Sequence, residues 1–242
     1  MRIVINHLTR MQKGYVCASG YDPEAEKHVR PLLPGRDNRL TTGFLALHGG
    51  PFDIGAIVDL GSPRCIGQPP ELEDHRIQTT SLKSAGAMTP DGFWAMLTHV
   101  ARKSLRAIFG NDLVIIGDKS AGVDVHRGHA SLGCLIPHNL PFLFLMAGRT
   151  GPRVRIIVKD DDFDLDLGVT DIRLYREDHV TPDPEAVRRA AIELCKCPCV
   201  LSVGLTRQYQ NATMTKPMHW LQVNNIHLLS NPVWTLRKDT RP

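Results

Sequence analysis

Short apolar segments separated by turn-forming residues most strongly constrain what this chain can fold into. The 242 residues include 20 glycines and 17 prolines, which stand between most of the apolar runs. Glycine interrupts regular structure because its backbone is unusually free, and proline does so because it lacks an amide proton. The pattern therefore favours many short strands and argues against a bundle of long helices.

The composition indicates an ordered and mildly basic protein. Hydrophobic residues make up 42% of the chain and charged residues 22%, which excludes wholesale disorder. The length suits one large domain or two small ones, with a core that needs no disulfide bridges. The net charge of +4 tolerates a polyanionic partner without requiring one.

The chain shows no targeting or membrane-spanning pattern. The apolar start reaches the polar Asn6 too early for a signal peptide, and the most apolar run, 140–147, is interrupted by Pro141. We therefore expect a cytoplasmic protein that does not enter a membrane. The cysteines are scattered unevenly, which predicts free thiols in a reducing compartment. They are Cys17, Cys65, Cys134, Cys195, Cys197 and Cys199.

Alternation of apolar and polar residues predicts strands in both halves of the chain. The expected strands are 2–8, 15–19, 27–31, 52–60, 113–116, 130–136, 142–146, 154–158, 163–167, 171–175, 199–205 and 219–226. The clearest hairpin joins 154–158 to 163–167. The polar segment 118–128 is predicted to be a loop.

Capping signals predict two helices. Thr89 and Pro90 are typical of a helix start, and apolar residues at helical spacing then continue to Gly110, where the helix is expected to end. Asp183 and Pro184 predict the start of a second helix, with an apolar face that includes Val187, Ala190 and Leu194.

A short sequence recurs near the two ends of the chain. Leu8, Thr9 and Arg10 end the first predicted strand, and Leu205, Thr206 and Arg207 end a late one. An apolar residue, a β-branched residue and an outward arginine suit a strand that leaves the core at a barrel rim. The recurrence is open to two interpretations, a structural duplication or chance.

Many short strands with two isolated helices indicate a mainly β chain (α+β) built from two small barrels. OB-folds have five strands, often with one helix, and two of them fill this length. We expect one OB-like β-barrel with a closing helix in 1–110 and a second OB-like barrel with a helix in 111–242.

Six short pieces carry a family resemblance that spans nearly the whole chain. They are INHLTR (5–10), HVRP (28–31), ASLGC (130–134), VTDIR (169–173), VGLTR (203–207) and HWLQV (219–223). Together they resemble the uncharacterised bacterial dual OB-domain family. The resemblance implies two OB-like barrels, nucleic-acid recognition and a role in a bacterial conflict (defence) system. It supplies no catalytic residue.

Arginines near strand ends and two aromatic residues form the candidate binding set. Arg10, Arg30 and Arg207 are predicted to hold phosphate, because a guanidinium group can bind it bidentately. Tyr209 and Trp220 are predicted to stack on unpaired bases. The alternative interpretation places Trp220 in the core and pairs the arginines with nearby carboxylates.

The histidine and cysteine motifs are weaker signals of metal binding. His126, His129 and Cys134, with Asp124 as a fourth candidate, have donor types that zinc prefers, but no second pair of ligands is nearby. Cys195, Cys197 and Cys199 lack the two-residue spacing of a zinc knuckle, so buried, inert thiols are expected. We therefore predict no metal site.

An acidic run is typical of a solvated hairpin tip. It consists of Asp160, Asp161, Asp162, Asp164 and Asp166. The run lacks the glycine and glutamate of a calcium-binding EF-hand loop. The chain also has neither a phosphate-binding Walker loop nor a dinucleotide-binding glycine motif, so no cofactor is expected.

Taken together, these patterns predict a protein that binds nucleotides or nucleic acid, the latter single-stranded, and is more a binding protein than an enzyme. One alternative is a metal-dependent enzyme that acts on nucleic acid through the aspartate run or through His126 and His129. The other is a protein-interaction adaptor, because a fold does not determine a function.

Overall fold

The computed structural model describes residues 1–35, 38–148, 151–210 and 216–236. Its fold is mainly β, with 42% strand and 19% helix, which confirms the predicted class. The first half contains the strands β1 (Arg2–Arg10), β2 (Tyr15–Asp22), β3 (Lys27–Leu32), β4 (Leu40–Thr41), β5 (Ala56–Asp59), β6 (Arg64–Cys65), β7 (Asp74–Arg76) and β8 (Lys83–Ala87). The second half contains β9 (Val114–Ile116), β10 (Ser120–Asp124), β11 (Leu132–Leu135), β12 (Phe142–Met146), β13 (Arg153–Lys159), β14 (Asp164–Gly168), β15 (Cys199–Leu205) and β16 (Met218–Leu228).

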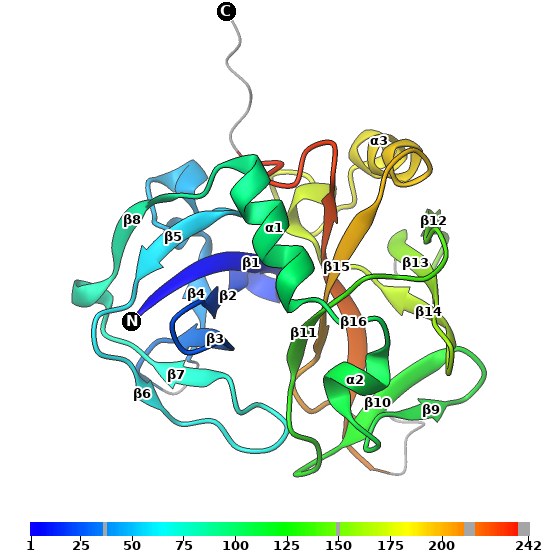
Figure 1. Ribbon diagram of the computed structural model, residues 1–242, viewed down its shortest axis with the longest axis horizontal. Coiled ribbons are helices and arrows are strands. Elements are labelled where there is room, and N and C mark those ends of the chain that lie inside the picture. The colour runs from blue at the N-terminus through cyan, green and yellow to red at the C-terminus, as the bar shows by residue number, and fades with distance from the viewer. Residues whose placement is uncertain (36–37, 149–150, 211–215, 237–242) are drawn as a thin grey trace, which may run out of the picture.

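The first half is built on one 8-stranded sheet, seen on the left of Figure 1. Its strand order is β6-β7-β3-β2-β1-β5-β8, and β4 pairs with β2 outside this path. β3 and β7 run parallel, while the other pairs are antiparallel. The register of β1 against β2 shifts between Ile5 and His7. This β-bulge at Asn6 changes which side chains of β1 share a face.

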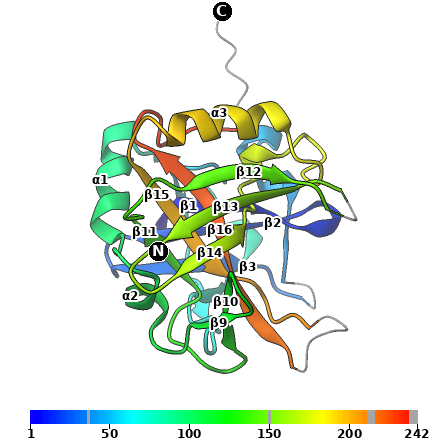
Figure 2. The ribbon, with the colours of Figure 1, turned by 90° about the vertical axis from the view of Figure 1, so that its right-hand side faces the viewer.

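The second half contains two smaller sheets. A 5-stranded sheet has the order β11-β15-β16-β10-β9, and a 3-stranded sheet has the order β12-β13-β14. Figure 2 shows the three-stranded sheet lying in front of the five-stranded one. The hairpin of β13 and β14 confirms the one that the alternating pattern predicts.

The expected OB-like barrels are not confirmed, because no sheet in the described part of the chain closes into a barrel. β6 pairs only with β7 and β8 only with β5, so the two ends of the eight-stranded path do not bond to each other. Both edge strands are exposed along their length. The sheet therefore stays open at the place where barrel closure would occur.

The predicted helix from Thr89 to Gly110 is two helices, α1 (Pro90–Val100) and α2 (Leu105–Phe109). Thr89 caps the first as expected, since its hydroxyl accepts a hydrogen bond from Gly92 N. The break arises because Arg102 pairs with β11: Arg102 N donates to Cys134 O (2.8 Å) and Ile136 N donates to Arg102 O (2.9 Å). A strand-like contact from the other half of the chain thus competes with the helix.

The second predicted helix is confirmed as α3 (Pro184–Leu194). The Asp183 carboxylate accepts hydrogen bonds from two amides of its first turn, and Val187, Ala190 and Leu194 are buried. α3 lies over the edge of the second half, beside β12 (Figures 1 and 2).

Three further segments differ from the sequence prediction. The expected loop 118–128 contains β10, because pairing with β9 and β16 makes Ala121 and Val123 part of the core. The expected strand 171–175 is a 3-10 turn, η5 (Ile172–Leu174), capped by the Asp171 carboxylate. In 52–60 only β5 is a strand. Other 3-10 turns are η1 (Gln12–Gly14), η2 (Thr42–Phe44), η3 (Ala46–His48) and η4 (Thr79–Ser81).

The buried apolar residues form two clusters: the first combines residues of the first half with Cys134, Ile172 and Val200 of the second, and the second consists of residues of α2 and of the second half. Phe93 and Leu97 of α1 pack in the first cluster, whereas Leu105, Ile108 and Phe109 of α2 pack in the second. The two helices therefore pack in different clusters, and the predicted domain boundary at 110 stays a prediction. Among the described residues, no helix is both long enough and apolar enough to cross a membrane.

Candidate binding cavity between the two halves

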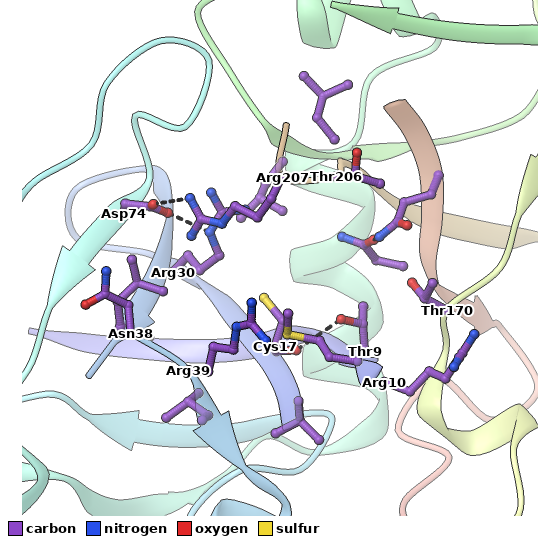
Figure 3. Close-up of a pocket in the computed structure, with 18 of the residues that line it drawn as sticks. Thr9, Arg10, Cys17, Arg30, Asn38, Arg39, Asp74, Thr170, Thr206 and Arg207 are labelled. Carbon is purple, nitrogen blue, oxygen red and sulfur yellow. Dashed lines mark hydrogen bonds and ion pairs between the residues drawn. The ribbon is translucent and has the colours of Figure 1, made fainter. Parts of the chain in front are cut away.

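A cavity of about 990 Å³ lies where the two halves meet. Its walls come from β1, β2 and β3 of the first half and from β11, β15 and β16 of the second. Figure 3 shows side chains from both halves around this space. We call it the central cavity.

The two recurring Leu-Thr-Arg segments reach the same cavity. Thr9 and Arg10 line it from the end of β1, and Thr206 and Arg207 line it from the end of β15. Backbone bonds hold both ends: Arg10 N donates to Thr170 O (3.0 Å), and Thr206 N donates to Trp220 O (2.8 Å). Whether the segments reflect a duplication stays a prediction, but their strand-end position is as expected.

Two of the predicted arginines share a carboxylate. Arg30 Nε donates to Asp74 Oδ1 (2.6 Å), and Arg207 Nη1 donates to Asp74 Oδ2 (2.6 Å). Figure 3 shows both guanidinium groups directed at Asp74. Arg207 Nη1 also lies 2.8 Å from Glu71 Oε1. Burial alone would lower the pKa of Arg207, but the negative charges of Asp74 and Glu71 raise it above its usual value.

Arg30 and Arg207 differ in exposure, which separates their roles. The Arg30 side chain is 5% exposed, whereas that of Arg207 is 45% exposed. Both arginines pair with carboxylates, as in the alternative interpretation, and the buried pair of Arg30 with Asp74 joins β3 to β7. Arg207 keeps a solvent-facing side from which it can reach a ligand.

Two other cavity arginines have no carboxylate partner among the residues that the structure describes. The Arg10 guanidinium lies 4.6 Å from the ring centroid of Tyr175, and that of Arg39 lies 5.3 Å from the ring centroid of Tyr15. Within the described chain, neither arginine forms an ion pair. Arg10 Nε is buried and has no hydrogen-bond partner there. The cavity therefore carries a surplus of positive charge beyond what Asp74 and Glu71 neutralise.

Both predicted aromatic residues line the cavity. Tyr209 is 58% exposed, which leaves its ring accessible to a ligand. Trp220 is half-buried, and its indole Nε1 has no partner in the described chain. Trp220 thus lines the cavity and is not fully buried, although its indole Nε1 is a buried donor without a partner in the described chain.

The structure brings all five sequence-predicted residues, Arg10, Arg30, Arg207, Tyr209 and Trp220, to this one cavity. Sequence reasoning missed Arg39 and Asp74. Arg39 precedes β4, which is too short to show a periodic pattern, and Asp74 is on a strand of three residues. No sequence signal distinguishes Asp74 from the other carboxylates of the chain.

The alternative metal and nuclease motifs do not converge. In the described residues, His126 and His129 do not form a metal-ligand group with Cys134, and Asp124 instead pairs with Lys216 at 2.7 Å. The carboxylates of the acidic run have separate partners. Asp160 bonds to Leu105 N, Asp161 to His138, Asp162 to Arg106, Asp164 to Lys159 and Asp166 to Arg155.

The three clustered cysteines stay unbridged. Cys197 Sγ lies 3.5 Å from both Glu193 O and Ser230 Oγ. Burial, and then the nearby Cys197, raise the pKa of the Cys199 thiol to about 12. Cys199 is therefore a protonated, unreactive thiol at neutral pH.

Comparisons with models of known protein families, with curated proteins and with solved structures return no match. The resemblance to the dual OB-domain family therefore stays a prediction.

Proposed function

We propose that the protein binds a phosphate-bearing ligand, a nucleotide or a single-stranded nucleic acid, in the central cavity. The observation that carries this proposal is the meeting of Arg10, Arg207, Tyr209 and Trp220, from opposite ends of the chain, around one space. Arginine side chains bind phosphate, and aromatic rings stack on bases.

The charge distribution supports an anionic ligand. In the described part of the chain, Arg10 and Arg39 lack carboxylate partners, while Asp74 and Glu71 are already paired with Arg30 and Arg207. A phosphate group would therefore meet unneutralised guanidinium groups first. A volume of about 990 Å³ lies within the usual range for small-ligand sites.

We also propose that each half is an OB-like unit whose barrel is open. In the first half, the β1–β2–β3 meander is extended by parallel β7 at one edge and by antiparallel β5 at the other. OB-folds are Greek-key barrels that are often only partly closed, and they bind single strands in a comparable groove.

Fluorescence anisotropy with a labelled single-stranded DNA and a labelled RNA oligonucleotide tests the proposed binding. Affinity is measured over a series of salt concentrations. Each phosphate contact releases counterions, so the loss of one contact should flatten the slope of log affinity against log salt concentration by about 0.7 for a single strand. We expect Arg39→Ala and Arg10→Gln each to weaken binding and to flatten this slope. Competition with mononucleotides distinguishes a nucleotide site from a strand site.

Arg188→Ala is the matched control. Arg188 is an exposed arginine on α3, away from the cavity, and its loss removes the same charge. It should leave the salt slope unchanged. Absence of binding at low salt to either oligonucleotide and to mononucleotides would overturn the proposal and favour the adaptor alternative, as would equal effects of Arg188→Ala and Arg39→Ala.

A further inference from the structure

Two histidines and a cysteine meet beside the central cavity, in a group that the sequence did not reveal. His7 lies on β1, His28 on β3 and Cys134 on β11. The first two come from the first half of the chain and the third from the second half. Their potential ligand atoms all lie within 4.8 Å of one another.

The geometry is close to that of a metal site. Cys134 Sγ lies 3.9 Å from His28 Nε2, and the two imidazole rings stand edge to face with centroids 5.2 Å apart. Zinc binds imidazole nitrogen at about 2.0–2.1 Å and thiolate sulfur at about 2.3 Å. In a tetrahedral site these bond lengths separate two ligand atoms by about 3.3–3.6 Å. The three ligand atoms, now up to 4.8 Å apart, would therefore approach one another by about 1 Å on binding.

An unsatisfied polar atom points to a missing ligand. His7 is 1% exposed, and its Nε2 has no hydrogen-bond partner in the described chain. Its other ring nitrogen, Nδ1, is already occupied, because it lies 3.0 Å from the Asn224 side-chain nitrogen. Buried polar atoms are rarely left unpaired, so an orphan nitrogen beside a second imidazole and a thiol needs an explanation.

The protonation of the group suits a cation. Burial, and then the nearby His28, His227 and Arg30, lower the pKa of His7 well below its usual value. Burial and the charge of Arg102 lower the pKa of His28 to about 4. A neutral imidazole has one nitrogen lone pair, and that of His28 Nε2 now faces Asn6 Nδ2 at 3.3 Å, a contact that a bound metal ion would replace.

The surrounding polar groups can orient these ligands. Asn6 Nδ2 lies 3.2 Å from Cys134 Sγ, and Ser202 Oγ lies 3.8 Å from it. With the Asn224 amide rotated, its oxygen would accept a hydrogen bond from His7 Nδ1 and leave Nε2 free to bind metal. The Gln222 amide, whose Nε2 now donates to Asn224 Oδ1 (2.9 Å), would rotate with it. Such second hydrogen bonds to ligating histidines are usual in metal sites.

We propose that His7, His28 and Cys134 bind one zinc ion, with water as the fourth ligand. Binding replaces the thiol proton of Cys134: the S–H bond breaks, a zinc–sulfur bond forms and the proton passes to solvent. The ion would link β1 and β3 to β11 and so join the two halves next to the cavity. This site is independent of the ligand proposed for the cavity.

A catalytic cysteine–histidine pair is the competing interpretation of the same residues. Burial raises the pKa of Cys134 to about 11, although hydrogen bonds from Ser202 and Asn6 lower it. A nucleophilic cysteine needs a lowered pKa and access to substrate. Cys134 is 1% exposed and has neither, so ligation fits the group better.

The test uses the full chain, stripped with a chelator and then titrated with Co²⁺ as a spectroscopic substitute for zinc. We expect one ion per chain and a thiolate-to-cobalt charge-transfer band that stoichiometric Zn²⁺ removes. His28→Gln and Cys134→Ser should abolish the band. Cys195→Ser and His126→Gln, which alter a cysteine and a histidine outside the group, should retain it.

Folding of the variants is checked by circular dichroism. If Cys134→Ser does not fold, the decision rests on the wild-type band and on His28→Gln, whose side chain is only partly buried. Absence of the charge-transfer band in the wild type overturns the proposal. Retention of the band at one ion per chain in folded His28→Gln does so as well.

Discussion

The side-chain amide of Asn225 pairs with both backbone groups of Leu8. Leu8 N donates to Asn225 Oδ1 (2.6 Å), and Asn225 Nδ2 donates to Leu8 O (3.1 Å). Both residues are fully buried. An amide side chain of β16 thus takes the place of a neighbouring strand for β1 and fastens the two halves together beside the central cavity.

Replacement of Asn225 by alanine should therefore destabilise the whole protein. The change leaves the buried N–H and C=O groups of Leu8 without partners, at a cost of about 2–4 kcal/mol. Urea denaturation measures this loss. Asn139→Ala, at an exposed asparagine, is the control and should change the free energy of unfolding by less than about 0.5 kcal/mol. A similar small change for Asn225→Ala would contradict the structural role.

Arg30 and Arg207 should differ in their contribution to stability. Arg30→Met removes the buried partner of Asp74 and should lower the free energy of unfolding by about 3 kcal/mol. Arg207→Met removes a half-exposed partner, which water screens, so the loss should be about 1 kcal/mol. Chemical denaturation of both variants measures the difference. Equal losses would show that burial does not separate the two arginines.

Trp220 should act on ligand affinity without acting through charge. If it stacks on a base as proposed, Trp220→Leu should weaken oligonucleotide binding by about 1–3 kcal/mol. The salt slope should stay at the wild-type value, because stacking releases few ions. Anisotropy titrations at several salt concentrations separate this result from that of Arg10→Gln. A flattened slope for Trp220→Leu would argue against stacking.

His227 should make the fold sensitive to acid. Burial, and then the charge of Arg173, lower its pKa to about 3 from a usual value of 6.5, although Asp171 and hydrogen bonds oppose the shift. Between pH 3 and pH 6.5, His227 is therefore protonated in the unfolded chain and neutral in the folded chain. The contribution of His227 to the free energy of unfolding is fully present above pH 6.5. It falls by about 1.4 kcal/mol per pH unit as the pH drops towards 3.

Urea denaturation between pH 7 and pH 5 measures this slope. His227→Gln loses the titrating group, so its free energy of unfolding should fall with acid less steeply than that of the wild type. The difference should correspond to about one proton. Comparison of the two proteins removes the contributions of other histidines. Parallel pH profiles would show that His227 is not the group responsible.

The local sequence determined the kinds of elements and several of their ends. Thr89 and Asp183 cap helices as predicted, because a cap depends only on a side chain and the amides that follow it. The alternation in β13 and β14 predicted a hairpin because the two strands are adjacent in the sequence and only a short turn separates them. The arginines at the ends of β1 and β15 were found because strand ends can be located from local patterns.

The tertiary structure decided which of these ends meet. Arg102 lies outside the helices and pairs with Cys134, and the segment expected to be a loop before β11 contains the strand β10. In both places, hydrogen bonds to residues distant in the chain outweigh the local conformational preference. Cys134 is close in sequence to His126 and His129, yet in the fold it lies with His7 and His28. Spacing along the sequence reports only local geometry, whereas these contacts arise from the packing of one half against the other.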